Sequence, residues 1–283
     1  MTIYSRLMGG LGNQLFQYAT AYAMAKRADT DLILDIRGLK GKADHITFGL
    51  QPFKISAKIG EDQNLPPARE HLVPYTLWRY FGRNPRQFRE KGLGLNPSLL
   101  TALDNIYLHG YFQTEKYFQE FTDDLRDEFQ LSSEPNDVSE AWLSKIRDAQ
   151  SVSVHIRRGD YLGTGMEHVC DADYYQRGID RLTAQFGGDL SYFIFSNDLD
   201  WVRENLHFDG TAQFVTGNEA AHPSEDLRLM AACNHHIIAN STFSWWGVWL
   251  NEKKDKTVIA PKDWFGTYKA ENPDLLPESW VTI

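Results

Sequence analysis

Residues 152–161 read Val-Ser-Val-His-Ile-Arg-Arg-Gly-Asp-Tyr, a short strand pattern that runs directly into two arginines. Valine and isoleucine alternate with more polar residues over the first five positions, as in a β-strand with a buried face. Arg157 and Arg158 then stand at the carboxyl end of the predicted strand. Guanidinium forks match phosphate oxygens, so the pair could neutralise a diphosphate without a metal ion. A cluster of surface salt bridges is the alternative.

The chain around this run alternates strands with helices. Such alternation predicts an α/β fold with a parallel sheet covered by helices on both faces, in which ligands bind at the carboxyl ends of strands. The predicted strands are 152–156, 192–195, 213–215, 236–239 and 258–260, and the predicted helices are 174–182, 201–206, 225–232 and 245–250.

The N-terminal part begins with the same order of elements. A strand over 3–8 meets a glycine-rich turn, and a helix follows from Asn13, a candidate N-cap, to about Arg27. Leu32-Ile33-Leu34 predicts a second strand. Proline, glycine and charged residues interrupt every period between residues 38 and 96, and order returns with a strand at 106–108.

A polar segment with a proline, Ser132–Asn136, is the best linker candidate. It predicts an N-terminal domain of residues 1–136 and a C-terminal domain of residues 137–283.

Composition limits the class of protein. The chain of 283 residues has 29 Lys and Arg against 38 Asp and Glu, a formal charge of −9, which argues against a general nucleic-acid or anionic-membrane surface. Cys170 and Cys233 are the only cysteines, so no disulfide framework is expected and both are interpreted as buried. Without a signal peptide or a spanning segment, the expectation is a cytoplasmic protein, with peripheral contact at the inner membrane left open.

A second segment suited to an anion is the turn at residues 9–18, Gly-Gly-Leu-Gly-Asn-Gln-Leu-Phe-Gln-Tyr. Its glycines let a ligand approach the backbone, and the following helix offers free N–H groups. Leu15 stands where a dinucleotide fingerprint needs its third glycine, which disfavours an oxidoreductase, and a P-loop lysine is missing. A tight turn without a ligand is the alternative.

A third segment, residues 237–247, reads Ile-Ile-Ala-Asn-Ser-Thr-Phe-Ser-Trp-Trp-Gly. Hydroxyl groups at the start of a helix could hold phosphate, and a plain helix cap with core tryptophans is the competing interpretation. Asp198 follows a strand and Glu225-Asp226 begin a helix, so one carboxylate could accept from the guanine ring. Helix capping is the more common role for each.

These three segments, with Gly-Tyr-Phe-Gln-Thr-Glu-Lys-Tyr-Phe at 110–118, resemble in order and separation the blocks of bacterial and animal α1,2-fucosyltransferases of glycosyltransferase family 11. The resemblance covers most of the chain and is weakest at 40–96. The His-x-Arg-Arg-x-Asp element at 155–160 is shared with α1,6- and protein O-fucosyltransferases. Residues 9–18 and 240–246 together indicate the α1,2 group.

The resemblance implies a GT-B fold, with two Rossmann-like domains facing each other across a cleft. It implies an inverting, metal-independent transfer of L-fucose from GDP-fucose to the 2-hydroxyl of a galactoside, in surface polysaccharide or O-antigen synthesis. The implied partners are GDP-fucose and a galactose-containing oligosaccharide or lipid-linked glycan acceptor. No cofactor, metal ion or nucleic acid is expected.

The resemblance also implies roles for individual residues. Arg157 binds the diphosphate, His155 lies near the guanine-ribose end, and Asn13 faces the sugar-phosphate from the other domain. Arg158 and Asp160 shape the arginine loop. The catalytic set is Arg157, Asp160 and Asn13; no general base is implied. The donor-binding set is His155, Arg157, Arg158, Gly10, Gly12, Asn13, Gln14, Asp198, Asp226, Asn240, Ser241, Thr242, Ser244 and Trp245.

Three alternatives remain at this point. A metal-dependent GT-A transferase would use an Asp-x-Asp site, which Asp171/Asp173 and Asp198/Asp200 both offer. An α1,6-type or other GDP-sugar transferase would share the arginine element. A sugar-binding protein without activity would explain the tryptophans but not a diphosphate clamp.

Overall fold

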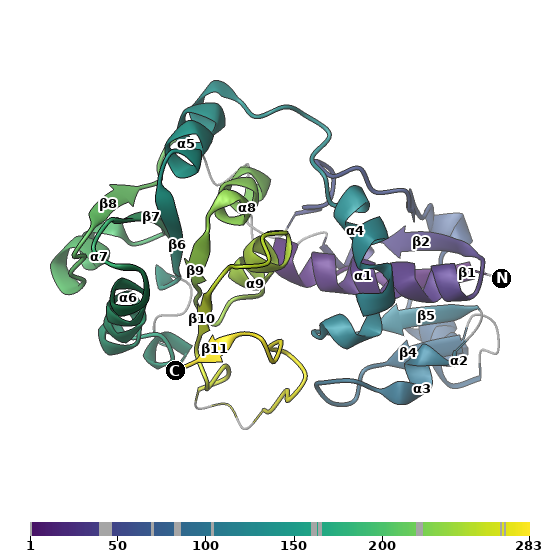
Figure 1. Ribbon diagram of the computed structural model, residues 1–283. Helices are drawn as coiled ribbons and strands as arrows, with labels where there is room; N and C mark the ends of the chain where they lie inside the picture. The colour runs from purple at the N-terminus through teal and green to yellow at the C-terminus, as the bar shows by residue number, and fades with distance from the viewer. Residues whose placement is uncertain are drawn as a thin grey trace. The chain divides into compact units, whose positions relative to one another are not determined.

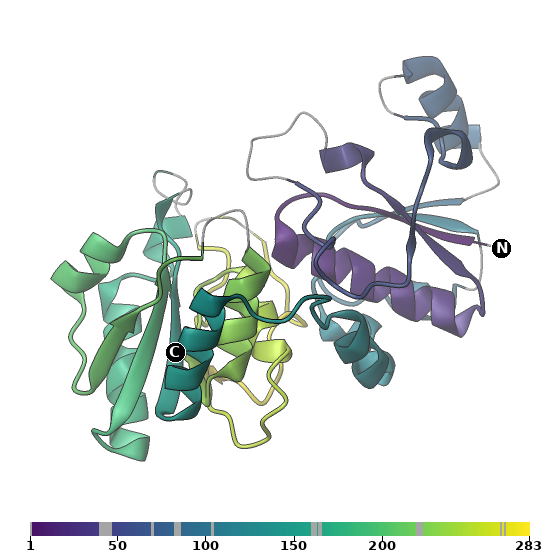
Figure 2. The same cartoon turned by 90° about the horizontal axis from the view of Figure 1, so that it is seen from above.

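The structure is a computed structural model that describes residues 2–39, 47–68, 71–81, 86–102, 105–159, 163, 166–218, 223–266, 268 and 270–283. The chain forms two compact units, Met1–Ser132 with Asn272–Leu275, and Ser133–Glu271 with Leu276–Ile283. Each unit is built on one parallel sheet flanked by helices (Figures 1 and 2), which confirms the predicted α/β class. The domain boundary at residue 136 stays a prediction.

The first unit holds a five-stranded sheet in the order β3-β2-β1-β5-β4. The chain adds β2 and β3 on one side of β1, then forms β4 at the opposite edge and places β5 between β4 and β1. The strands are β1 (Thr2–Arg6), β2 (Asp31–Asp35), β3 (Lys58–Ile59), β4 (Arg86–Arg89) and β5 (Ile106–His109). The helices are α1 (Leu11–Arg27), α2 (Leu72–Phe81), α3 (Pro97–Leu100) and α4 (Thr122–Glu128), with short 3₁₀ turns at Arg37–Leu39, Asp62–Asn64, Glu115–Tyr117 and Gln119–Phe121.

Helices α1 and α2 cover opposite faces of this sheet (Figure 2). Ile3 and Ser5 face α1, and the Ser5 hydroxyl donates to the Gln17 carbonyl at 3.2 Å. Tyr107 faces the other way, where Trp78 of α2 packs edge-on against it with ring centroids 5.2 Å apart. Alternating side chains of the strands therefore meet a different helix on each face.

The start of α1 differs from the prediction. The helix begins at Leu11 with Gly10 as its N-cap and no side-chain cap, so the predicted cap at Asn13 was wrong. Gly9 has a φ of +73°, which lets the chain turn straight from the strand into the helix. The Asn13 side chain instead accepts a hydrogen bond from Gln113 Nε2 at 2.9 Å.

The second unit holds a six-stranded sheet in the order β11-β10-β9-β6-β7-β8. All five predicted strands occur, and β11 is an addition. The strands are β6 (Gln150–Ile156), β7 (Leu190–Ser196), β8 (Thr211–Phe214), β9 (His235–Ile237), β10 (Val258–Ala260) and β11 (Val281–Thr282). The helices are α5 (Asp137–Arg147), α6 (Ala172–Phe186), α7 (Leu199–Asn205), α8 (Pro223–Ala232) and α9 (Thr242–Trp249), with a 3₁₀ turn at Met166–His168.

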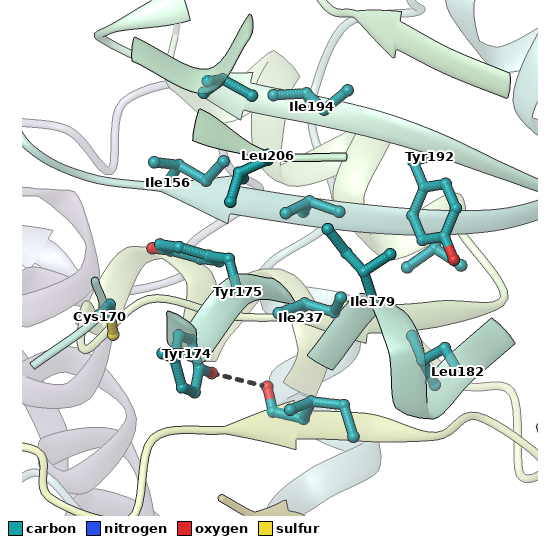
Figure 3. Close-up of a cluster of buried hydrophobic side chains, with 14 of the residues drawn as sticks. Ile156, Cys170, Tyr174, Tyr175, Ile179, Leu182, Tyr192, Ile194, Leu206 and Ile237 are labelled. Carbon is teal, nitrogen blue, oxygen red and sulfur yellow. Dashed lines mark hydrogen bonds between the residues drawn. The ribbon is translucent and has the colours of Figure 1, made fainter. Parts of the chain in front are cut away.

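The core of the second unit lies on both faces of its sheet. Helices α6 and α7 pack on one face, and α5 and α8 on the other. Figure 3 shows Tyr174, Tyr175 and Ile179 of α6 against the strands. The buried hydroxyls of Tyr174 and Tyr175 donate to the carbonyls of Ile238 (2.6 Å) and His155 (3.1 Å), so helix α6 is fixed to the strand ends. Both cysteines are buried and free, as predicted.

Candidate active site

The candidate site lies at the carboxyl edge of the second unit's sheet. The chain runs outward from β6 through β7 and β8, and then returns to place β9 on the other side of β6. Ligands of such sheets bind at this switch point, outside the carboxyl ends of the strands. Residues 157–159 follow β6, residues 197–198 follow β7 and residues 240–242 follow β9. The topology therefore brings the arginine and hydroxyl segments to one edge.

Arg157 is half-buried and comes directly after β6. Val154 pairs with Ile237, so continuing the register by three residues brings Arg157 level with Asn240. Helix α9 begins two residues later, capped by the Ser241 hydroxyl, which accepts from the Phe243 N–H at 3.3 Å. An anion here would meet both a guanidinium group and the positive end of a helix.

Arg158 turns toward β7. Its Nε lies 3.1 Å from Asp198 Oδ2, and its guanidinium carbon lies 4.1 Å from the centre of the Trp201 ring. Its backbone N–H donates to Asn197 Oδ1 at 3.1 Å. The other Asp198 oxygen accepts from the Trp201 N–H and caps α7. Arg158 is thus held within the protein, through Asn197 and Trp201, which the sequence did not single out.

Gly159 explains why a glycine follows the arginines. A Cβ atom there would come within 2.6 Å of Asn197 Nδ2, so a side chain would displace the residue that orders the loop. The position of Asn197 two residues after the predicted strand 192–195 was the available signal for it. Asp160 lies outside the described residues, and its catalytic role stays a prediction.

The hydroxyl segment is mostly buried. The Ser244 hydroxyl donates to the carbonyls of Ala239 (3.3 Å) and Ser241 (3.1 Å), and Asn240 Nδ2 donates to the Trp264 carbonyl at 3.2 Å. These bonds build the turn between β9 and α9. Of the predicted ligand-binding residues in this segment, Thr242 is the one that is not buried.

Trp245 has no exposed surface and packs against Trp246 and Trp280 at centroid distances of 5.0 and 5.7 Å. The side chain supports α9 from the core, as in the competing interpretation of core tryptophans, and donor contact by Trp245 stays a prediction. Ser244 is also fully buried, and its contact with the donor stays a prediction.

His155 occupies the last but one position of β6 and is 9% exposed. Its ring centroid lies 5.7 Å from that of Phe243, which is in the first turn of α9. His155 therefore lies beside the first turn of α9, and its place near the guanine-ribose end of the donor stays a prediction.

The two carboxylates of the predicted donor-binding set, Asp198 and Asp226, differ in their surroundings. Both oxygens of Asp198 are engaged by Arg158 and the α7 backbone. Asp226 is half-buried in the first turn of α8, and its Oδ1 accepts from Asn218 Nδ2 at 3.1 Å. Burial raises the pKa of Asp226 to about 6. Asp226 is therefore the carboxylate more available to a ligand.

The first unit has its own switch point between β1 and β5. The Gly9–Gly12 turn follows β1, and Gln113, which binds Asn13, follows β5. The Gln14 side chain is fully buried: its Nε2 donates to the carbonyls of Gly9 (2.9 Å) and Thr47 (2.8 Å), and its Oε1 accepts from the Gly49 N–H (2.9 Å). Gln14 therefore shapes the turn, and its contact with the donor stays a prediction, as does that of Gly10, Gly12 and Asn13.

Glu90 was missed by the sequence analysis. Its carboxylate accepts the N–H groups of Tyr111 (2.7 Å) and Phe112 (3.1 Å). Phe112 has a φ of +54°, unusual for a bulky residue, so the carboxylate stabilises a strained turn. Glu90 thereby positions Gln113 against Asn13.

The two Asp-x-Asp pairs have structural partners. Asp171 and Asp198 are N-caps of α6 and α7. Asp173 and Asp200 form ion pairs with arginines of the same helices, at 2.9 and 2.8 Å. Within the described ranges, no group of three or more His, Cys, Asp or Glu side chains could hold a metal ion. Nor does the described part of the chain contain a helix long and apolar enough to cross a membrane.

Comparison with known proteins connects this geometry to one family. The sequence model of glycosyl transferase family 11 matches residues 2–283. An α-1,2-colitosyltransferase of Escherichia coli is 32% identical over 99% of this chain and 98% of its own length. The O-antigen biosynthesis glycosyltransferase WbnK of the same species is 30% identical over 99% of this chain and 100% of its own length. Galactoside α-(1,2)-fucosyltransferase 2 of Bos taurus is 26% identical over 86% of this chain and 67% of its own length.

Two solved structures share the fold. POFUT1 in complex with GDP-fucose has a TM-score of 0.56 and 15% identity, covering 92% of this chain and 97% of its own. NodZ α-1,6-fucosyltransferase soaked with GDP-fucose has a TM-score of 0.51 and 15% identity, covering 94% and 97%. The likeness of fold to these two structures confirms the predicted GT-B fold class.

Proposed function

Because the chain belongs to glycosyl transferase family 11, we propose that it transfers L-fucose from GDP-fucose to the 2-hydroxyl of a galactoside. The transfer inverts the anomeric carbon and uses neither a metal ion nor a cofactor. The observation that carries this proposal is the place of Arg157 at the β6/β9 switch point, level with the turn into α9. The α1,2 linkage is supported by relatives named α-1,2-colitosyltransferase and galactoside α-(1,2)-fucosyltransferase.

The chemistry requires stabilisation of a leaving group. The bond between the anomeric carbon and the β-phosphate oxygen breaks, the acceptor 2-oxygen forms the new bond from the opposite face, and its proton is released. Negative charge grows on the diphosphate as the sugar becomes cationic. Arg157 and the N–H groups at the start of α9 are preorganised donors that would stabilise this charge, as an oxyanion hole does.

Arg158 acts as a positioning residue in this proposal. Its bonds to Asp198, Trp201 and Asn197 fix the loop that begins with Arg157. Preorganisation matters because a catalytic donor that must first find its place stabilises the transition state less. A diphosphate contact by Arg158 would have to compete with Asp198.

Asp226 is our candidate for reading guanine. Its carboxylate would accept hydrogen bonds from the ring N–H and the amino group of the base, and a uracil or adenine would leave it unpaired. The ionised form is the acceptor. Because burial raises the pKa of Asp226 to about 6, donor affinity should decline below that pH.

A second donor is favoured by one observation, the full-length similarity to an α-1,2-colitosyltransferase. Colitose is fucose without its 3-hydroxyl group. A site that binds the 3-hydroxyl would reject the deoxy sugar strongly, whereas an apolar pocket discriminates by much less. Competition between GDP-fucose and GDP-colitose for one acceptor separates the two.

We further propose a galactose-containing oligosaccharide or lipid-linked glycan as acceptor, in surface polysaccharide synthesis. A relative named for O-antigen biosynthesis supports this assignment. The expected setting is cytoplasmic with peripheral membrane contact, and no nucleic-acid partner is proposed.

The direct test measures release of the nucleoside diphosphate from GDP-fucose and GDP-colitose across a panel of galactosides, with GDP-mannose and UDP-galactose as donor controls. We expect release only with GDP-fucose or GDP-colitose and a galactoside. Release that requires no acceptor, or that occurs equally with UDP-galactose, would refute the proposal.

A further inference from the structure

Helix α2 carries apolar side chains on its outer as well as its inner face. Toward the sheet, Trp78 packs on Tyr107 and lies 5.9 Å from Tyr75. A helix that is apolar all round is ordinarily buried, so we expect the outer face of α2 to bind another surface. The exposed apolar residues of the outer face are Leu72 (70%), Val73 (70%), Leu77 (55%), Tyr80 (66%) and Phe81 (76%).

These residues form one continuous surface. At about 100° per residue, the five side chains and Thr76 occupy an arc of roughly 180°. Arg79, the one charged residue of the helix, falls just outside the arc. Five of the nine large apolar side chains that are exposed in the described part of the chain belong to this ten-residue helix. Contiguous apolar surface of this kind marks an interaction site.

The sequence around α2 is basic, although the protein is acidic. Residues 69–91 carry six Arg and Lys against two Glu, a net charge of +4 in a chain whose total is −9. Arg79, Arg86, Arg89 and Lys91 are all exposed, and none forms an ion pair with a carboxylate among the described residues. Arg86 follows the last residue of α2 by five positions and therefore lies within roughly 18 Å of it.

We propose that α2 docks onto an anionic lipid bilayer and lies in the plane of the headgroups. Its outer face would enter the acyl boundary, and the four cations would face headgroup phosphates. Ten residues span about 15 Å, half of the roughly 30 Å hydrocarbon core, so the helix lies on the membrane and does not cross it. Tyr80 suits this boundary because one end of its ring is polar.

The positive charge favours a bilayer over a second copy of the chain. A two-fold dimer through α2 would bring the same basic segment of both copies together, and like charges would oppose association. The inference does not depend on the proposed transfer reaction, because binding to vesicles is measured without a donor or acceptor.

The test is co-sedimentation of the full chain with vesicles of phosphatidylcholine containing about one-third phosphatidylglycerol. We expect binding at about 50 mM salt that weakens at about 500 mM, and weaker binding to pure phosphatidylcholine, because headgroup attraction is screened by salt. Arg86→Gln with Arg89→Gln should lower binding at low salt. Wild-type protein that stays in the supernatant at low salt would overturn the proposal.

A matched pair of variants tests the apolar face. Val73 and Val138 are each the second residue of a helix, α2 and α5, and are 70% and 39% exposed. Val73→Glu should reduce the partition coefficient on the order of tenfold, because a charge would replace a valine that the proposal places in the acyl boundary of the bilayer. Val138→Glu should bind like wild type, and both should keep the wild-type melting temperature.

Equal binding by the two variants would contradict the role of α2. If the protein does not bind vesicles, forms a dimer in the analytical ultracentrifuge, and Val73→Glu dissociates that dimer, the outer face of α2 binds a second copy of the chain instead.

Discussion

Alanine substitutions at two neighbouring arginines should separate stability from turnover. Arg158 makes an ion pair with Asp198 at 3.1 Å and lies 4.1 Å from the Trp201 ring centre, with 18% of its side chain exposed. A well-formed ion pair contributes up to about 1 kcal/mol, and a cation–π contact about 0.5–1 kcal/mol. Arg158→Ala should therefore lower the free energy of unfolding by roughly 1–2 kcal/mol and the melting temperature by about 2–8 °C.

Arg157→Ala should act on the reaction. If Arg157 stabilises charge that develops on the diphosphate, its removal should reduce kcat on the order of 10²–10³-fold. Arg157→Lys should restore little, because an ammonium group lacks the planar fork. Arg158→Ala should reduce kcat by less than Arg157→Ala, through misplacement of the loop.

The assay compares kcat, GDP affinity and melting temperature for the purified variants. Asp198→Asn is the control for the stability effect, and a double-mutant cycle with Arg158→Ala isolates the pair. Folded Arg157→Ala with near-wild-type turnover would refute the assignment of the diphosphate contact. If Arg158→Ala leaves the melting temperature unchanged and greatly lowers GDP affinity, Arg158 contacts the diphosphate and Arg157 does not.

Three other properties should follow. Gly9→Ala should lower the free energy of unfolding in urea by about 1–2 kcal/mol, because Gly9 has a φ of +73° and an added Cβ would lie 2.7 Å from Asn13 Nδ2. Gly10→Ala should lower it by less, because nothing lies within 4 Å of an added Cβ there. Equal losses in the two variants would contradict this reasoning. Burial lowers the pKa of His236 from 6.5 to about 3, so its stabilising contribution is complete above pH 6.5 and declines as the pH falls. The free energy of unfolding should therefore fall by about 2 kcal/mol by pH 5. If His236→Gln shows the same pH dependence in urea unfolding, protonation of His236 is not the cause of that fall. GDP should raise the melting temperature more than UDP, and Asp226→Asn should narrow the difference; equal shifts in the wild type would argue against a guanine site.

Much of the second unit could be predicted because its strands are locally evident. β6 carries valine or isoleucine at alternate positions, and β7, β8 and β9 are each followed by a helix. In a parallel sheet this order alone brings residues 157–159 and 240–242 to the same edge. The two sequence segments of this unit could therefore be placed at one edge without knowledge of any contact.

Other features depend on contacts distant in sequence. Strands β3 and β4 have two and four residues, are rich in charge and form the sheet edges, so residues 38–96 show no clear period. Arg158 meets Asp198 forty positions away, and Asn13 meets Gln113 a hundred positions away. Residues 272–275 return to the first unit, where Asp274 accepts from the Leu95 N–H at 2.8 Å. No local pattern encodes such pairs.

The most direct test of the account is the product formed from GDP-fucose and a β-galactoside in the presence of a strong chelator. Arg157 and the start of α9 supply the charge that a metal would otherwise bring, so transfer should continue. NMR of the product should show an α-linked fucose on the 2-oxygen of galactose, the inverted configuration. Transfer that stops with the chelator and returns with Mn²⁺, or a product with fucose at another oxygen or with retained configuration, would contradict the central claim.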